Sequence, residues 1–153
     1  MDPAVVMFGQ LILAAFLGAL MGAERSVIAR QQAGMRTYAL VSLGACAFVI
    51  AGTYIDAQYL NANFDPARVA AAIVQGVGFI GAGLIFMRGE NVHGITTAAG
   101  LWVSASIGVL VAFGMYSIAV FASALTLGIF FGLWYIEQTM KRWHADEKCQ
   151  NNA

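Results

Sequence analysis

Long apolar runs separated by short polar stretches are the main pattern along this chain. Each run is close to the roughly 20 residues that an α-helix needs to cross the hydrocarbon core of a bilayer. The last two runs are separated only by a turn at Phe113, Gly114 and Met115, because a single helix through both would far exceed the bilayer. The pattern therefore predicts an all-α, polytopic membrane protein with a short tail over 137–153 and five spanning helices, at about 4–23, 37–55, 69–87, 95–113 and 115–136.

Composition supports a membrane protein and excludes several other classes. Hydrophobic residues make up 60% of the 153 positions and charged residues 10%, which leaves too few ionisable side chains to cover a soluble domain. Eight basic and eight acidic residues cancel, so we expect no binding to nucleic acid. Cys46 and Cys149 lie in different surroundings and form no disulfide or metal-site pattern. No Lys or Arg precedes the first apolar run, so we expect that run to be retained rather than cleaved as a signal peptide.

Basic residues gather on one side of the predicted spans. Only Arg68 lies on the opposite side. Because excess positive charge stays in the cytoplasm, we expect the N-terminus outside and the C-terminus in the cytoplasm. The seven basic residues on the cytoplasmic side would be Arg25, Arg30, Arg36, Arg88, Lys141, Arg142 and Lys148.

Small residues recur at the four-residue spacing that lets membrane helices approach closely. The third span instead has glycines all around its circumference, so we expect that helix to be central. Three of these glycines also match the GxGxxG spacing of dinucleotide-binding loops, but no strand precedes them, and close packing or a locally unwound segment is the favoured interpretation. The predicted packing positions are Ala14, Gly18, Gly22, Gly76, Gly78, Gly81, Gly83, Thr96, Gly100, Ser104, Gly108, Ala124, Gly128 and Gly132.

Charged residues at the membrane edge are candidate functional groups, because leaving water is costly unless a partner is found. Glu24 follows Gly22 on a close-packing face. It either pairs with Arg36, which opens the second span, or is a solvated loop carboxylate. At the other side, Asp65 and Pro66 have the pattern of an N-cap and a first helical residue.

Arg68, three positions after Asp65, can fold back onto that carboxylate or hold Asp56 or an incoming anion. The third loop carries Arg88, Glu90, Asn91 and His93 near Thr96 and Thr97, and either threonine can cap the fourth helix. For His93, a solvated loop side chain is the favoured interpretation, and a ligand or proton relay is the alternative.

Enzyme chemistry is not indicated by any residue pattern. Ser104 and Ser106 have no His or Lys in the same helix to act as a base, and no Walker, HExxH or CxxC motif occurs. We therefore expect neither catalysis nor a cofactor. Magnesium needs only one or two carboxylates, but those near the spans lie at the edges, so no dedicated pore site is indicated and metal binding is left open. These carboxylates are Glu24, Asp56, Asp65 and Glu90.

Five motifs in order resemble the MgtC/SapB family of bacterial inner-membrane proteins over nearly the whole chain. They are GAERS (Gly22–Ser26), AGMRT (Ala33–Thr37), DPARVAA (Asp65–Ala71), GVGFIGAG (Gly76–Gly83) and GITTAAGLWVSASIG (Gly94–Gly108). The resemblance implies a five-helix membrane domain, a link to growth at low magnesium and to survival inside host cells, and modulation of other membrane proteins, ATPases among them. Longer members carry a C-terminal ACT-like domain, so this chain looks like the short, membrane-only branch.

Carried over motif by motif, the resemblance implies functional positions at Glu24, Arg25, Arg36, Thr37, Asp65, Arg68, Asn91, Thr96, Thr97 and Trp102. We expect a non-enzymatic regulatory or accessory protein. The alternative is a transporter or channel subunit for a cation such as magnesium. The expected partners are membrane lipid and either a second copy of the chain or another membrane protein.

Overall fold

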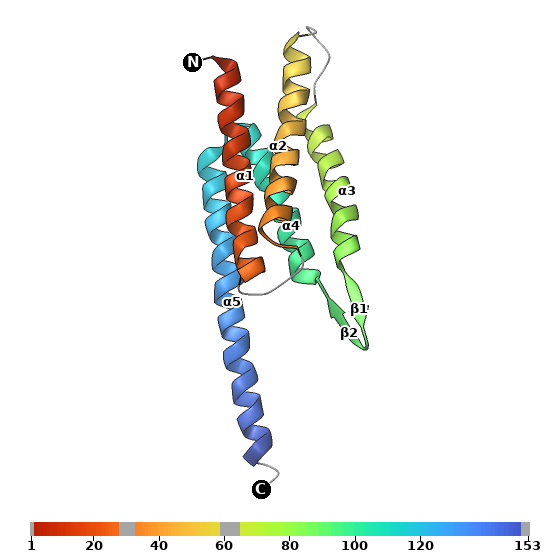
Figure 1. Ribbon diagram of the computed structural model, residues 1–153, viewed down its shortest axis with the longest axis vertical. Coiled ribbons are helices and arrows are strands. Elements are labelled where there is room, and N and C mark those ends of the chain that lie inside the picture. Colours follow the sequence, from red (N-terminus) through yellow and green to blue (C-terminus); the bar gives the residue numbers. More distant parts are fainter. Residues whose placement is uncertain (1, 28–32, 59–64, 151–153) are drawn as a thin grey trace.

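The computed structural model describes the backbone of residues 2–27, 33–58 and 65–150, and the side chains of these residues except 27, 58, 134 and 137–150. Five helices in this part of the chain are long and apolar enough to cross a membrane, which confirms the predicted all-α membrane fold (Figure 1). The helices are α1 (Pro3–Val27), α2 (Met35–Gln58), α3 (Pro66–Leu84), α4 (Ile95–Ala112) and α5 (Tyr116–Gln150). Four of the basic residues that contribute to the predicted orientation lie outside the described residues or side chains. They are Arg30, Lys141, Arg142 and Lys148.

Local sequence explains two of the helix ends. Asp65 is the N-cap of α3, and its side chain accepts hydrogen bonds from the backbone amides of Ala67 at 2.9 Å and Arg68 at 3.3 Å. The turn between α4 and α5 is centred on Gly114, whose φ of 74° lies in the left-handed region that glycine adopts without steric cost. Both features confirm the sequence prediction.

A small antiparallel hairpin joins α3 to α4 where we expected the third span to continue to Met87, followed by a loop. Strands β1 (Phe86–Arg88) and β2 (Asn91–His93) are connected by a two-residue turn that begins at Gly89, with φ 65°. The capping prediction for α4 was wrong: its N-cap is Gly94 in a left-handed conformation, without a side-chain hydrogen bond. A Cβ at Gly94 would collide with the Leu84 carbonyl oxygen, so only glycine fits here.

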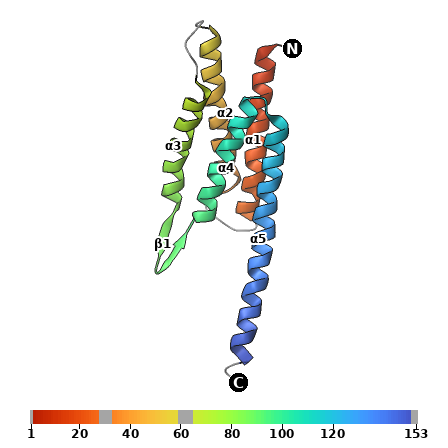
Figure 2. The ribbon, with the colours of Figure 1, turned by 180° about the vertical axis from the view of Figure 1, so that it is seen from behind.

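The central helix is α4, and the expectation of a central α3 was wrong. Half of the α4 span is buried, against 17% for α3, and α4 contacts all four other helices. Figure 2 shows α3 at the edge of the bundle, where it packs mainly on α4 and less on α2. Glycines around a helix allow close packing on every side, but they do not show which sides are used.

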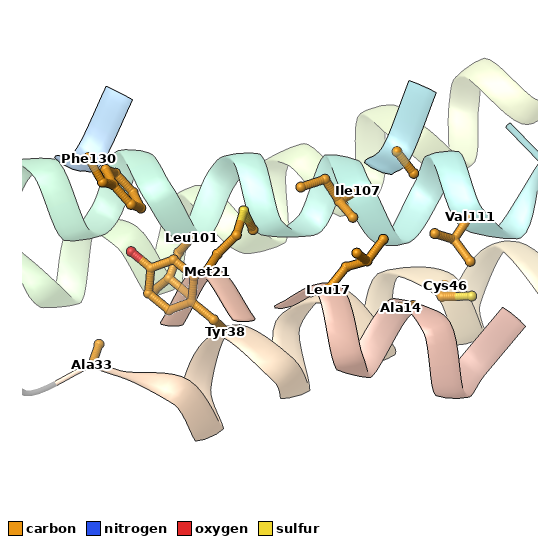
Figure 3. Close-up of a cluster of buried hydrophobic side chains, with 11 residues drawn as sticks. Ala14, Leu17, Met21, Ala33, Tyr38, Cys46, Leu101, Ile107, Val111 and Phe130 are labelled. Atoms are coloured by element: carbon orange, nitrogen blue, oxygen red, sulfur yellow. The ribbon is translucent and has the colours of Figure 1, made fainter. Parts of the chain in front are cut away.

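The core follows α4 along its length. Figure 3 shows side chains from α1, α2 and α5 meeting there, with Met21, Leu101 and Ile107 fully buried. Many large apolar side chains point outward instead, Phe79 with 84% exposure among them. An apolar outer surface of this kind suits contact with lipid.

Helix α5 is longer than the predicted 115–136 span. Its 35 residues extend about 52 Å at 1.5 Å per residue, beyond the ~30 Å hydrocarbon core. Figure 1 shows its C-terminal half projecting past the other helices, so much of the predicted tail is helical.

Candidate functional site

Two glycines bring α1 and α2 into backbone contact. A Cβ added to Gly18 would lie 2.6 Å from the Tyr38 carbonyl oxygen, and one added to Gly22 would lie 2.7 Å from the Gly34 carbonyl oxygen. Any larger side chain would push the helices apart. This approach places the C-terminal end of α1, with its two charged residues, beside Tyr38.

Hydrogen bonds then join α2 to α4. The Tyr38 hydroxyl donates to the Thr97 carbonyl oxygen at 3.0 Å, and the Ser104 hydroxyl donates to the Tyr38 carbonyl oxygen at 2.8 Å. Gly100 leaves the space for this arrangement, because a Cβ there would collide with the Tyr38 hydroxyl and lie 2.8 Å from the Phe130 ring. Figure 3 shows the rings of Tyr38 and Phe130 close together at the same end of the core.

A buried ion pair lies next to these rings. Arg25 Nε is 2.8 Å from Glu24 Oε2, and the two side chains are 9% and 1% exposed. Neither atom has a hydrogen bond of suitable geometry to any described residue, so the contact is mainly electrostatic. The Arg25 guanidinium also lies over the Phe130 ring, 3.9 Å from its centroid. Tyr38 is within Coulombic range of both charges.

We call Glu24, Arg25, Tyr38, Thr97 and Phe130 the Glu24 cluster. It joins α1, α2, α4 and α5 at one end of the bundle. Neither interpretation offered for Glu24 from the sequence is correct, because this carboxylate is buried and its partner is Arg25. Arg36 is exposed, and among the described residues it forms no ion pair.

Other residues singled out from the sequence lie elsewhere. Asp65 and Arg68 are at the opposite end of the bundle, where the Arg68 amide rather than its guanidinium contacts Asp65. Asn91 is in the exposed hairpin, where His93 stacks on Phe86 at 5.6 Å between ring centroids. The side chains of Thr96 and Trp102 are exposed on α4. Thr37 is half-buried and faces a groove between α2 and α3, together with Arg36 and Arg68.

The predicted packing glycines divide into two groups. Those on α1 and α4 make the close contacts described above, and a Cβ on Gly108 would collide with the Ser42 carbonyl oxygen. On α3, only Gly81 meets a neighbour, with its added Cβ 3.6 Å from the Ala98 Cβ. Among the predicted packing positions, the glycines whose added Cβ atoms would meet nothing within 4 Å are Gly76, Gly78, Gly83, Gly128 and Gly132.

Tyr38 and Phe130 were not identified from the sequence as site residues. Tyr38 directly follows the AGMRT motif. Because a tyrosine in an apolar helix needs a hydrogen-bond partner for its hydroxyl, Tyr38 could have been identified from the sequence as a site residue. Phe130 gave no signal, because a phenylalanine in an apolar run is as consistent with lipid contact as with a buried ring.

The Glu24 cluster is suited to holding helices in one arrangement. Its cation and anion neutralise each other, and the aromatic ring adds a second contact for the cation. Within the described residues, no three His, Cys, Asp or Glu side chains gather in a way that would hold a metal ion.

Comparison with known proteins shows which family the chain resembles. The chain matches the MgtC family over residues 11–139. It is 43% identical over 121 residues to the Escherichia coli K12 protein named "Putative magnesium transporter YhiD", covering 77% of this chain and 56% of that protein. It is also 43% identical over 130 residues to Protein MgtC of Salmonella typhimurium LT2, covering 83% and 53%.

A third relative, Protein MgtC of Brucella abortus, is 43% identical over 113 residues, covering 74% of this chain and 45% of that protein. The chain thus spans about half the length of these curated relatives. No solved structure matches.

Proposed function

The chain belongs to the MgtC family, and on this premise we propose that it is a regulatory or accessory membrane protein linked to adaptation to low magnesium. It acts by changing the behaviour of other membrane proteins, such as a membrane ATPase. Its location is the bacterial inner membrane, with the N-terminus outside and the Glu24 cluster at the cytoplasmic side.

The buried Glu24–Arg25 pair is the observation that carries this proposal. Magnesium binds to oxygen ligands and retains several waters. A magnesium ion approaching Glu24 would meet the positive guanidinium of Arg25, only 2.8 Å from the carboxylate. The carboxylate is therefore already neutralised from within the protein, which favours a role in helix arrangement over one in ion binding.

The same pair offers a way to transmit a signal. Two charges taken out of water are expensive unless further hydrogen bonds support them, and here Glu24 Oε2 and Arg25 Nε have none to the part of the chain that the structure describes. The stability of the Glu24–Arg25 pair therefore depends on the present spacing of the helices around it. A partner that contacts α5 or the end of α1 can change the spacing of the helices and so favour a second arrangement.

Transport of a cation is the second candidate, favoured by one observation. Glu24 is 3% exposed, and its Oε2 accepts no hydrogen bond from the residues of 2–27, 33–58 and 65–150, so a buried oxygen that could bind a cation is present inside the bundle. This function requires Arg25 to move away from Glu24 before any cation binds. The name of the Escherichia coli relative agrees with this alternative.

A growth assay with a paired substitution tests the regulatory proposal. Glu24→Leu with Arg25→Met removes both charges, and replacing a buried ion pair by apolar side chains is often neutral for stability. We expect this double variant to insert and fold, yet to fail to support growth in low magnesium in a strain that depends on this chain. Arg25→Lys, which retains the charge, is the matched control and should retain partial growth support.

Co-purification of partner proteins from the same membranes provides the second measurement. We expect the wild-type chain to retain a membrane-protein partner that the double variant loses. Normal growth of the folded double variant would contradict the proposal, because the Glu24 cluster would then have no role in function.

A further inference from the structure

A long apolar groove separates α2 from α3 on one side of the bundle. Its volume is about 890 Å³, which is within the ~300–1,000 Å³ range of ligand pockets. α2 and α3 lie side by side in both views (Figures 1 and 2). Every fourth or third residue of each helix lines the groove, with Leu40, Gly44 and Phe48 from α2 and Gly76 and Ile80 from α3.

The floor of the groove is a small cluster of side chains that includes α4. Ala45, Val77 and Ala105 are buried together there. The outer walls are open, since Leu40, Phe48 and Ile80 are 66%, 69% and 44% exposed. An apolar occupant entering from the side would cover these side chains.

Both ends of the groove carry an arginine. Arg36, with Thr37 beside it, lines one end, and Arg68 lines the other. Arg36 is exposed and forms no ion pair within the described part of the chain. A guanidinium at the end of an apolar channel complements a molecule that has an anionic head and a hydrocarbon tail.

We propose that the groove between α2 and α3 binds one anionic phospholipid, with its phosphate on Arg36 and Thr37 and an acyl chain along the apolar walls. The choice of Arg36 over Arg68 rests on the proposed orientation, which places Arg36 in the cytoplasmic leaflet, where anionic lipid headgroups meet basic pockets between helices. The site does not depend on the regulatory function.

The length of the groove favours a lipid chain over a spanning helix. The twelve steps from Arg68 to Ile80 extend about 18 Å at 1.5 Å per residue. The groove is therefore shorter than the ~30 Å hydrocarbon core that a spanning helix must cross. A helix from a second copy would cross both leaflets and extend well past it.

Two glycines provide substitutions that fill the groove without disturbing the fold. Gly44 and Gly76 line it, and a Cβ added to either would meet nothing within 4 Å. Leucine is also a better helix former than glycine. Gly44→Leu and Gly76→Leu should therefore fold while occupying the space of the acyl chain. Gly128→Leu is the matched control, because Gly128 is equally open but lies outside the groove.

Native mass spectrometry of the full chain in detergent measures the binding. The probes are palmitoyl-oleoyl phosphatidylglycerol, phosphatidylcholine with the same chains, and sn-glycerol 3-phosphate. We expect one retained phosphatidylglycerol per chain, weaker retention of phosphatidylcholine and no retention of glycerol phosphate. Arg36→Gln should weaken phosphatidylglycerol binding about tenfold, and Arg36→Lys less, because a charge-assisted hydrogen bond is lost. Gly44→Leu and Gly76→Leu should remove it, and Gly128→Leu should retain it.

Several results would overturn the proposal. Unchanged lipid retention in both Gly44→Leu and Gly76→Leu would place the lipid elsewhere. Equal binding of phosphatidylcholine, or a loss with Arg68→Gln in place of Arg36→Gln, would reject the headgroup assignment. Binding of glycerol phosphate alone would indicate a soluble anion, and a cysteine crosslink between two copies from position 44 would indicate a second chain in the groove.

Discussion

The guanidinium carbon of Arg25 lies 3.9 Å from the centroid of the Phe130 ring. This contact joins the end of α1 to α5, more than 100 residues apart in the sequence. It also gives the buried cation a second neighbour besides Glu24. The position of α5 against the bundle therefore depends on the same charge pair that we propose to carry the function.

Replacing Phe130 tests this contact. Phe130→Leu removes the ring face below the cation, and a desolvated cation–π contact is worth about 2 kcal/mol. We expect the free energy of unfolding in detergent to fall by at least that amount, with a further loss from the cavity. The control is Phe131→Leu, since Phe131 is 46% exposed. Equal effects of the two substitutions would contradict a specific role for Phe130.

The buried ion pair predicts strongly non-additive stability effects. Glu24→Leu alone leaves the Arg25 charge uncompensated, and removing one partner of a buried pair costs about 3–5 kcal/mol. The double variant Glu24→Leu/Arg25→Met should be near wild type in stability, so the coupling in a double-mutant cycle should be large. The measurement is chemical unfolding of the four proteins in the same detergent. Additive losses would mean that the two side chains do not interact.

Two glycines distinguish packing within the chain from packing between chains. Gly100→Leu should prevent folding, because the new side chain would occupy the place of the Tyr38 hydroxyl and the Phe130 ring. Gly128→Leu should leave the fold intact. If the expected partner is a second copy of the chain that packs on the exposed small residues of α5, the same substitution should weaken self-association. Thermal unfolding and crosslinking in native membranes measure the two effects. A monomer in wild-type membranes would contradict the second expectation.

The proposed orientation predicts which thiols a reagent reaches from outside. Cys149 should be protected from a membrane-impermeant maleimide in intact cells, because seven of the eight basic residues lie on its side of the membrane. A cysteine introduced by Asn61→Cys should be labelled. Permeabilised cells provide the control, in which both should react. Labelling of Cys149 in intact cells would reverse the orientation.

Features set by nearby residues could be predicted from the sequence. The five spans follow from the length of the apolar runs, and the start of α3 follows from the Asp65–Pro66 pair. The turn at Gly114 was also predictable, because a single helix through both apolar runs would far exceed the thickness of the bilayer. Each of these depends on the chemistry of a few neighbouring residues.

Features set by distant residues could not be predicted. Tyr38 and Thr97 are 59 positions apart, and nothing in either segment indicates that the hydroxyl of one binds the carbonyl of the other. The pairing of Glu24 with Arg25 was missed because adjacent residues usually point to different sides of a helix. The hairpin over 86–93 resembled a loop, since its strands have only three residues each.

Magnesium flux into liposomes tests the central claim most directly. Purified wild-type chain would be reconstituted as the only protein, with a magnesium indicator inside and a magnesium gradient across the membrane. The regulatory function predicts the same slow leak as in protein-free liposomes, and no difference between wild type and Glu24→Leu/Arg25→Met. Saturable flux in the wild type that the double variant lacks would contradict it and establish the chain as a transporter.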